Sequence, residues 1–246
     1  MNRHSRIWRR RGILAGILAL VLPLANFALA EEPPAATQPP ILAEALPLLE
    51  RNPDTIGWLK VGDVVDMPVV QRDNDYYLHH NFDGKETSRG TVFLDEECSI
   101  LPRDENLVLY GHNMRDGAVF GNLSRFRELS YLKKHPIATF DTIYQEGKYV
   151  IVAVYDMSAE TEDSHFMQML RFNFIDNEYF MGFYYEARDR SYYKIPVDVQ
   201  YGDKLLTLIT CSYTYYDGRL ILILRELRED EDPNEVAALM QDTVLR

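Results

Sequence analysis

Two short apolar runs in the C-terminal half of the chain constrain its fold more than any other feature. Residues 205–209 and 220–224 consist of Leu, Ile and one Thr, and the turn dipeptide Asp217-Gly218 lies between them. Apolar runs of this length around a turn predict neighbouring antiparallel strands. Cys211 follows the first run and Arg219 opens the second. The two side chains are therefore predicted to lie close together, with Cys211 where its strand gives way to a loop.

A cysteine beside an arginine is a chemically useful pair. The cation favours the thiolate and can hold a developing oxyanion. Most free cysteines, however, are small buried residues without special reactivity. His112 changes the balance, because it follows another apolar strand, predicted over residues 107–110. A base at a strand end can meet the nucleophile, as a Cys–His pair requires.

These residues lie in motifs that resemble those of sortases. The resemblance rests on Thr207-Leu-Ile-Thr-Cys211 with Arg219 eight residues later, and on Tyr110-Gly-His-Asn-Met114 upstream. The His-Asn-Met continuation, the segment 76–84 and the long insert before the cysteine strand are similar to the class B branch. The resemblance covers about residues 42–227, which is nearly the whole chain after its N-terminal region.

The resemblance implies a cysteine transpeptidase. Cys211 would attack the carbonyl of a threonine in the C-terminal sorting signal of a secreted protein and form a thioacyl enzyme. His112 would transfer protons, Arg219 would stabilise the oxyanion, and the amine of a cell-wall precursor would accept the acyl group. A sorting motif of the Asn-Pro-x-Thr type is implied, and no metal or organic cofactor. Ile209 departs from the small hydroxyl residue that class B enzymes often carry two positions before the cysteine.

Other functions remain open on the sequence. A thiol hydrolase that uses water, or a pilin-polymerising sortase, would need the same three catalytic residues. A catalytically silent surface-binding barrel is a different class, and the intact His112, Cys211 and Arg219 argue against it. His79 and His80 are adjacent in a predicted strand piece, so their side chains would point to opposite faces and make poor joint metal ligands.

The remaining strand signals predict a mainly β fold. Many short strands with few strong helices favour an antiparallel barrel with helical decorations. The resemblance implies a sortase-type closed β-barrel of about eight strands, with N-terminal helices and an insert whose loop and helix wall the substrate groove. Strands are predicted near residues 68–70, 76–78, 90–94, 137–144 and 149–155, and helices over 41–50, within 119–134 and over 178–188, the last with Phe180, Phe183 and Tyr184 on one side.

The N-terminal region predicts a membrane anchor. Residues 12–30 form an apolar run behind five arginines, long enough to span a bilayer with the N-terminus in the cytoplasm. A cleaved signal peptide is the alternative, because Ala28-Leu-Ala30 resembles a signal-peptidase site. The expected organisation is a signal anchor at 1–30, a Pro/Ala linker at 31–40, the catalytic domain at 41–228 and an acidic C-terminal tail at 229–246 to which no function is assigned.

The chain beyond the anchor is strongly acidic. The formal net charge is −12, from 26 basic and 38 acidic side chains, and it becomes −17 without the five N-terminal arginines. Such a domain is not expected to bind nucleic acid. It suits an extracellular enzyme, and the resemblance implies one held by a single span at a Gram-positive-type cell surface. A disulfide between Cys98 and Cys211 would remove the nucleophile, so the catalytic interpretation predicts that both are free.

Overall fold

The computed structural model describes residues 38–159, 170–214 and 216–246. The apolar run at 12–30 lies outside these ranges. Among the helices inside them, none combines the length and the apolar character that a membrane span requires.

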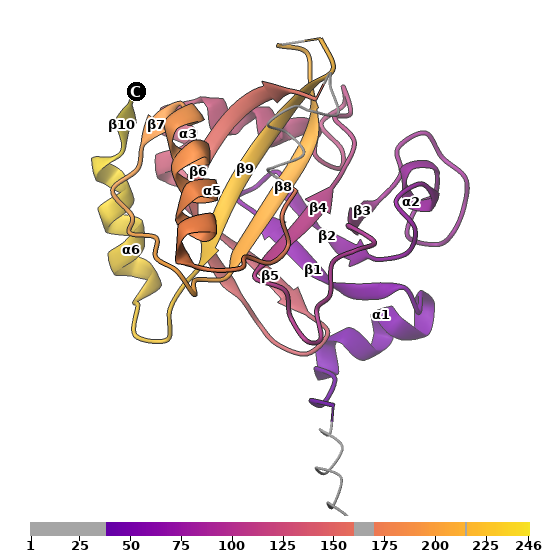
Figure 1. Ribbon diagram of the computed structural model, residues 1–246. Helices are drawn as coiled ribbons and strands as arrows, with labels where there is room; N and C mark the ends of the chain where they lie inside the picture. Colours follow the sequence, from indigo (N-terminus) through magenta and orange to yellow (C-terminus); the bar gives the residue numbers. More distant parts are fainter. Residues whose placement is uncertain (1–37, 160–169, 215) are drawn as a thin grey trace, which may run out of the picture. The chain divides into compact units, whose positions relative to one another are not determined.

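Eight strands close into a barrel within the described residues (Figure 1). This architecture confirms the predicted mainly β fold. The hydrogen-bonded order around the barrel is β1 (Thr55–Val61), β2 (Val65–Val70), β3 (Val92–Leu94), β4 (Asn106–Tyr110), β8 (Leu205–Ser212), β9 (Gly218–Glu226), β6 (Lys148–Ser158) and β5 (Ile137–Thr142), which returns to β1.

The barrel is mixed, so the expectation of an antiparallel barrel is wrong for two of its strand pairs. β2 pairs with β3 in parallel, and β4 pairs with β8 in parallel, while the other neighbours are antiparallel. A parallel pair needs a long crossover connection, because the chain must return to the same end of the sheet. The chain provides two such connections, residues 71–91 between β2 and β3 and residues 111–204 between β4 and β8. Long-range pairing of this kind leaves no local signal in the strand sequences.

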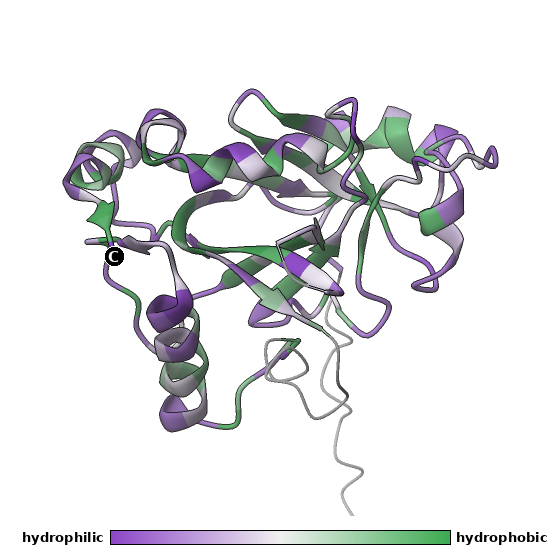
Figure 2. Cartoon of the chain, turned by 90° about the horizontal axis from the view of Figure 1, so that it is seen from above, coloured by the Kyte–Doolittle hydropathy of each residue, from purple (hydrophilic) through white to green (hydrophobic). Residues whose placement is uncertain are grey.

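The strands around the site are buried on both faces. In β6 every residue from Tyr149 to Met157 is buried, which explains the continuous apolar and aromatic sequence of residues 149–155. Helix α5 (Asn177–Arg190) packs against β6 and buries Phe180, Phe183 and Tyr184, as the periodicity predicted. Figure 2 shows hydrophobic colour along the strands and alternating hydrophobic and hydrophilic stretches on the helices.

The other predicted helices form in shorter pieces. The 3-10 helix η1 (Ala43–Ala45) and α1 (Leu46–Arg51) occupy the predicted segment 41–50. Residues 119–134 contain the 3-10 helix η2 (Gly121–Arg127) and α3 (Leu129–Lys134).

The predicted strand piece at 76–78 is wrong, because these residues belong to the short helix α2 (Tyr76–His79). The carboxylate of Asp73 accepts hydrogen bonds from the backbone N–H groups of Asp75 and Tyr76, at 3.2 and 2.8 Å. This side chain starts a turn in the backbone, which the aromatic composition of the segment hides. His80 follows α2, so the two histidines are not alternating residues of one strand.

Residues 229–246 form part of the packed structure. Helix α6 (Pro233–Leu239) and the 3-10 helix η3 (Met240–Asp242) bury Val236 and Met240 in the main core. The last strand, β10 (Val244–Leu245), pairs with β7 (Tyr193–Lys194) beyond the end of α5.

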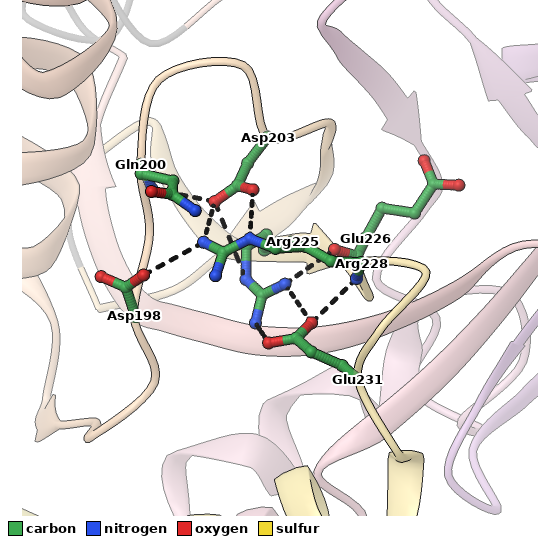
Figure 3. Close-up of polar contacts among 7 residues, drawn as sticks. All are labelled: Asp198, Gln200, Asp203, Arg225, Glu226, Arg228 and Glu231. Carbon is green, nitrogen blue, oxygen red and sulfur yellow. Dashed lines mark hydrogen bonds and ion pairs between the residues drawn. The ribbon is translucent and has the colours of Figure 1, made fainter.

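A charged cluster fastens the start of this segment to β9 (Figure 3). Arg225 has a side chain only 1% exposed, and its two terminal nitrogens donate to the carboxylate of Glu231 at 2.6 and 2.8 Å. Arg228 donates to both carboxylate oxygens of Asp203, each at 2.8 Å, and to Asp198 at 3.2 Å. Bidentate pairs of this type fix orientation as well as charge.

Candidate active site

A cleft of about 410 Å³ opens where β4, β8 and β9 meet the α2 segment. It brings His112, Cys211 and Arg219 together, as the sequence predicted for their positions. Most of the remaining lining is apolar or aromatic. The lining residues are Asn74, Leu78, Phe93, Tyr110, Gly111, His112, Ile209, Thr210, Cys211 and Arg219.

Cys211 and Arg219 are direct cross-strand neighbours. Their positions are paired in the antiparallel register of β8 and β9, so both side chains stand on the same face of the sheet. The thiol is exposed, in contrast to the residues on either side of it. The sequence had placed Cys211 at the beginning of a loop. In the structure β8 continues to Ser212, so Cys211 lies inside the strand.

The parallel register of β4 and β8 carries His112 to the same end of the sheet. Tyr110 of β4 is paired with Ile209 of β8. His112 lies two residues after Tyr110, and Cys211 lies two residues after Ile209, so the two are at the same level of the sheet. The backbone N–H of Gly111 donates to the Ile209 carbonyl at 3.3 Å, which continues the ladder past the end of β4.

Two side chains fasten the His112 segment to the end of β8. The hydroxyl of Thr210 donates to the carbonyl of Gly111 at 2.7 Å. The amide of Asn113 donates to the backbone carbonyl of Cys211 at 2.7 Å. Because these bonds lie immediately before and after His112, they fix the backbone of the histidine relative to that of the cysteine.

The imidazole of His112 is held by the α2 segment. Its Nε2 lies 2.9 Å from the carbonyl oxygen of Leu78. A carbonyl oxygen only accepts hydrogen bonds, so Nε2 carries a hydrogen and Nδ1 is the nitrogen left for proton exchange. An ion pair between Arg89 and Asp116, at 2.6 Å, also joins the chain after α2 to the chain after His112.

The guanidinium of Arg219 is anchored at one nitrogen. Nη1 donates to the carbonyl of Asp217 at 3.1 Å, to its carboxylate at 2.7 Å, and to the carbonyl of Gly218 at 3.0 Å. Asp217 has a positive φ of 45°, a conformation that Asp tolerates better than most residues. The tight turn therefore places a carboxylate where it can hold the arginine that follows.

The sequence did not single out three residues that complete this geometry. Leu78 supplies the carbonyl that holds His112, Asn113 ties the histidine loop to β8, and Asn74 lines the cleft. The resemblance did include the segments 76–84 and 110–114, but it gave no role to these positions.

Two predicted features lie elsewhere. The resemblance implied that a loop and a helix of the insert wall the groove; the described lining of this cleft includes no residue of α5, and residues 160–169 of the loop lie outside the described ranges. The exposed His79 lies 3.8 Å from the carboxylate of Asp75, and the ring of His80 stacks on Tyr76.

The two cysteines are both free, as predicted, but their surroundings differ. Cys98 is only 5% exposed, and burial raises the pKa of its thiol to about 12. Cys211 is exposed in the cleft. The structure therefore leaves Cys211 as the accessible thiol of the pair.

Comparison with known proteins agrees with this geometry. The family model described as the sortase domain matches residues 61–226. The chain belongs to the sortase family. Sortase B of Listeria monocytogenes is 31% identical over 179 residues, which cover 71% of this chain and 70% of that protein. Sortase B of Staphylococcus aureus is 28% identical and covers 72% of each.

Solved structures place the chain in class B. The X-ray structure of Clostridium perfringens sortase B is similar with a TM-score of 0.69 and 31% identity, covering 74% of this chain and 99% of that one. A Bacillus anthracis sortase B crystallised in complex with AAEK2 is 26% identical with the same TM-score, covering 77% and 85%. This sortase is accordingly a cysteine transpeptidase of the class B type.

Proposed function

We propose that this sortase cleaves a sorting signal after threonine at Cys211 and transfers the resulting acyl group to an amine of a cell-wall precursor. The observation that carries the proposal is the shared strand register. It places the exposed thiol of β8 opposite Arg219 of the neighbouring β9, and at the same level as His112, which follows the neighbouring β4. These are the nucleophile, cation and base that acyl transfer through a thioester requires.

Each group has a defined step. The Cys211 thiolate adds to the threonine carbonyl, and the tetrahedral oxyanion collapses to a thioester as the C–N bond breaks. His112 gives a proton to the leaving amine and later takes one from the incoming amine. Arg219 donates to the oxyanion through nitrogens other than Nη1, which is already engaged with Asp217 and Gly218. The product is an amide to the acceptor, Cys211 leaves as the thiolate, and the proton from the incoming amine stays on His112.

The cleft supports an extended, partly apolar peptide as donor. Leu78, Phe93, Tyr110 and Ile209 contribute apolar surface, and Asn74 contributes an amide that can bond peptide groups. Such a lining with few polar groups is typical of sites that fix one orientation of a ligand. We take Asn-Pro-x-Thr as the starting motif for experiments.

An amine acceptor is the step that separates transpeptidation from hydrolysis. A sortase B structure complexed with triglycine is 25% identical to this chain, with a TM-score of 0.68, covering 75% of this chain and 86% of that one. Triglycine is therefore a reasonable first acceptor for this enzyme. Water would resolve the same thioester in the alternative thiol hydrolase, and a lysine of a pilin-like protein would resolve it in a polymerising sortase.

The test is mass spectrometry of products from an Asn-Pro-x-Thr peptide library, with and without triglycine. We expect cleavage after threonine and products that carry the glycine amine, together with a thioester adduct on Cys211. Only free acids at saturating triglycine would support the hydrolase instead. Peptide-to-peptide products with a lysine-bearing acceptor, but none with triglycine, would support polymerisation.

A further inference from the structure

A partly buried polar network lies behind the end of the nucleophile strand. The carboxylate of Asp156 in β6 is 1% exposed and receives two hydrogen bonds from Arg127 of η2, at 2.8 and 2.7 Å. The hydroxyl of Tyr192 also donates to this carboxylate. Burial alone raises the pKa of Asp156, but the hydrogen bonds that the carboxylate accepts, those from Arg127 foremost, outweigh it and the pKa is lowered. The carboxylate is therefore charged and paired.

The network reaches the active-site strand through one hydroxyl. Nη2 of Arg127 bonds the Asp156 carboxylate at 2.7 Å and donates to the Oγ of Ser212 at 2.9 Å. Ser212 is buried and directly follows Cys211. Its oxygen also accepts from the backbone N–H of Thr214 at 3.2 Å and its hydrogen is directed to the Thr214 hydroxyl at 3.1 Å. A hydroxyl offers one donor and two acceptor sites, so Ser212 is fully engaged.

Strand register places this network on the face opposite the thiol. Asp156 and Thr210 are both paired with Leu220, so their side chains share one face. Ser212 lies two residues after Thr210 and uses the same face, whereas Cys211 uses the other. The network therefore holds the end of β8 from behind without entering the cleft. Ser212 is also paired with Gly218, the residue before Arg219. A contact that holds Ser212 therefore supports the end of β8 and the start of β9 together.

We propose that Arg127 and Ser212 are positioning residues for the Cys211 reaction. Asp156 holds Arg127, and Arg127 holds the C-terminal end of β8 through its hydrogen bond to Ser212. This contact orients the Cys211 thiol toward the substrate carbonyl. The inference rests on the proposed acyl transfer at Cys211. Neither residue touches the reacting atoms, so the expected effect is on the rate of acylation and not on substrate binding or on the chemistry of the thiol.

The main variant is Ser212→Ala, which cuts the link but leaves the Arg127–Asp156 pair. With a quenched fluorogenic Asn-Pro-x-Thr peptide, we expect kcat for acylation to fall roughly 10-fold, as for loss of one hydrogen bond to a charged group. KM should stay within about twofold of its original value. Alkylation of Cys211 by iodoacetamide, which needs no oriented attack on a carbonyl, should stay at the unmodified rate.

Arg127→Lys tests the link from the other side. A lysine keeps the charge beside Asp156 but has no planar fork to reach the carboxylate and Ser212 together. It should lower kcat to a similar extent. The double variant should be no slower than the slower single variant, because both changes break the same contact.

Thr207→Val is the matched control. It removes another buried hydroxyl of β8, which donates to Asn106 at 2.9 Å and has no connection to Arg127. Its kcat should remain near that of the unmodified enzyme even where its melting temperature falls.

Three results would overturn the proposal. They are a Ser212→Ala enzyme with unchanged kcat, alkylation that slows in parallel with acylation, and losses that multiply in the double variant. A different result tests the proposed function itself: if the unmodified enzyme forms no acyl adduct while iodoacetamide still labels Cys211, acyl transfer is refuted independently of the network.

Discussion

The three proposed catalytic side chains differ in what holds them in the free protein. His112 is fixed at Nε2 by a backbone carbonyl, and Arg219 is fixed at Nη1 by the turn before it. Within the described ranges, the thiol of Cys211 is fixed through its own strand, which Asn113 and Ser212 tie to neighbouring segments. Base and cation are therefore preorganised, and the nucleophile depends on the register of β8.

Replacement of these side chains should affect turnover by different routes. Cys211→Ala should abolish acyl-enzyme formation. His112→Ala should lower kcat on the order of a hundred- to ten-thousand-fold, through loss of proton transfer. Arg219→Ala should cost on the order of a hundred- to a thousand-fold, about 3 to 4 kcal/mol, and Arg219→Lys should recover only part of it. Steady-state cleavage of the fluorogenic peptide measures each loss.

His79→Ala is the control for these variants, because His79 is exposed and pairs only with Asp75 among the described residues. Its turnover should stay near that of the unmodified enzyme. Near-full activity of Arg219→Ala together with loss of activity in His79→Ala would contradict the assignment of the three catalytic residues.

The two thiols should respond differently to a thiol-reactive dye. At neutral pH in the folded protein, we expect rapid labelling of Cys211 and slow labelling of Cys98, because burial blocks access and raises the Cys98 pKa to about 12. In denaturant both should label. Rapid labelling of a Cys211→Ala variant in the folded state would show that Cys98 is accessible, and a missing thiol in denaturant would indicate a disulfide.

At the scale of elements, the C-terminal segment depends on charge as well as on apolar packing. Glu231 precedes α6 and neutralises Arg225, which β9 buries almost completely. Burial of this arginine is tolerated because a bidentate carboxylate pairs its two terminal nitrogens, although its buried Nε has no hydrogen-bond partner among the described residues. The hydrogen bonds from Arg225 lower the pKa of Glu231, more than burial raises it.

Glu231→Gln should therefore destabilise the fold by about 3 kcal/mol, near the low end for a broken buried ion pair, because Glu231 is itself partly exposed. Urea unfolding at neutral pH measures this difference. A carboxylate whose folded pKa is lowered stabilises the fold above its ordinary pKa, and the stabilisation is lost as the pH falls through the lowered value. The difference in unfolding free energy between the Glu231→Gln protein and the unmodified protein should thus become smaller in acid.

Glu229→Gln is the matched control, since Glu229 is an exposed acid two residues earlier. It should leave the urea midpoint nearly unchanged. Equal stability of the Glu231→Gln protein and the unmodified one would show that Glu231 does not support Arg225. A difference in unfolding free energy that becomes larger in acid would contradict the sign of the Glu231 pKa shift.

At the scale of the whole molecule, charge and hydropathy divide the chain into two unlike parts. Five arginines and an apolar run occupy residues 1–30, and the rest carries a formal charge of −17. We propose that the N-terminal run anchors the enzyme in the cell membrane, with the acidic catalytic part outside. Substrates that cross the membrane and cell-wall precursors are both available on that side.

Protease shaving of intact cells that express the full chain tests this arrangement. The catalytic part should be degraded, while an N-terminal epitope tag stays protected and remains in the membrane fraction. A cytoplasmic protein serves as the control for cell integrity. Recovery of a soluble form beginning at residue 31 in the medium would show that the run is a cleaved signal peptide.

The sequence by itself determined the local features of this protein. The apolar runs at 205–209 and 220–224 and the turn signal between them predicted β8, β9 and the Cys211–Arg219 pair, because two strands close together in the sequence are the usual antiparallel neighbours. The spacing of Phe180, Phe183 and Tyr184 predicted the buried face of α5 for a similar reason, since helix periodicity is local.

Only the tertiary structure decided the long-range contacts. The parallel pairing of β4 with β8, which carries His112 to Cys211, joins segments about a hundred residues apart, and no local pattern encodes its register. The same holds for the carbonyl of Leu78 on His112, and for Arg127 and Asp156 behind Ser212. A backbone carbonyl is common to all residue types, and a buried ion pair forms only when distant elements meet. These contacts depend on barrel closure, which is a property of the whole chain.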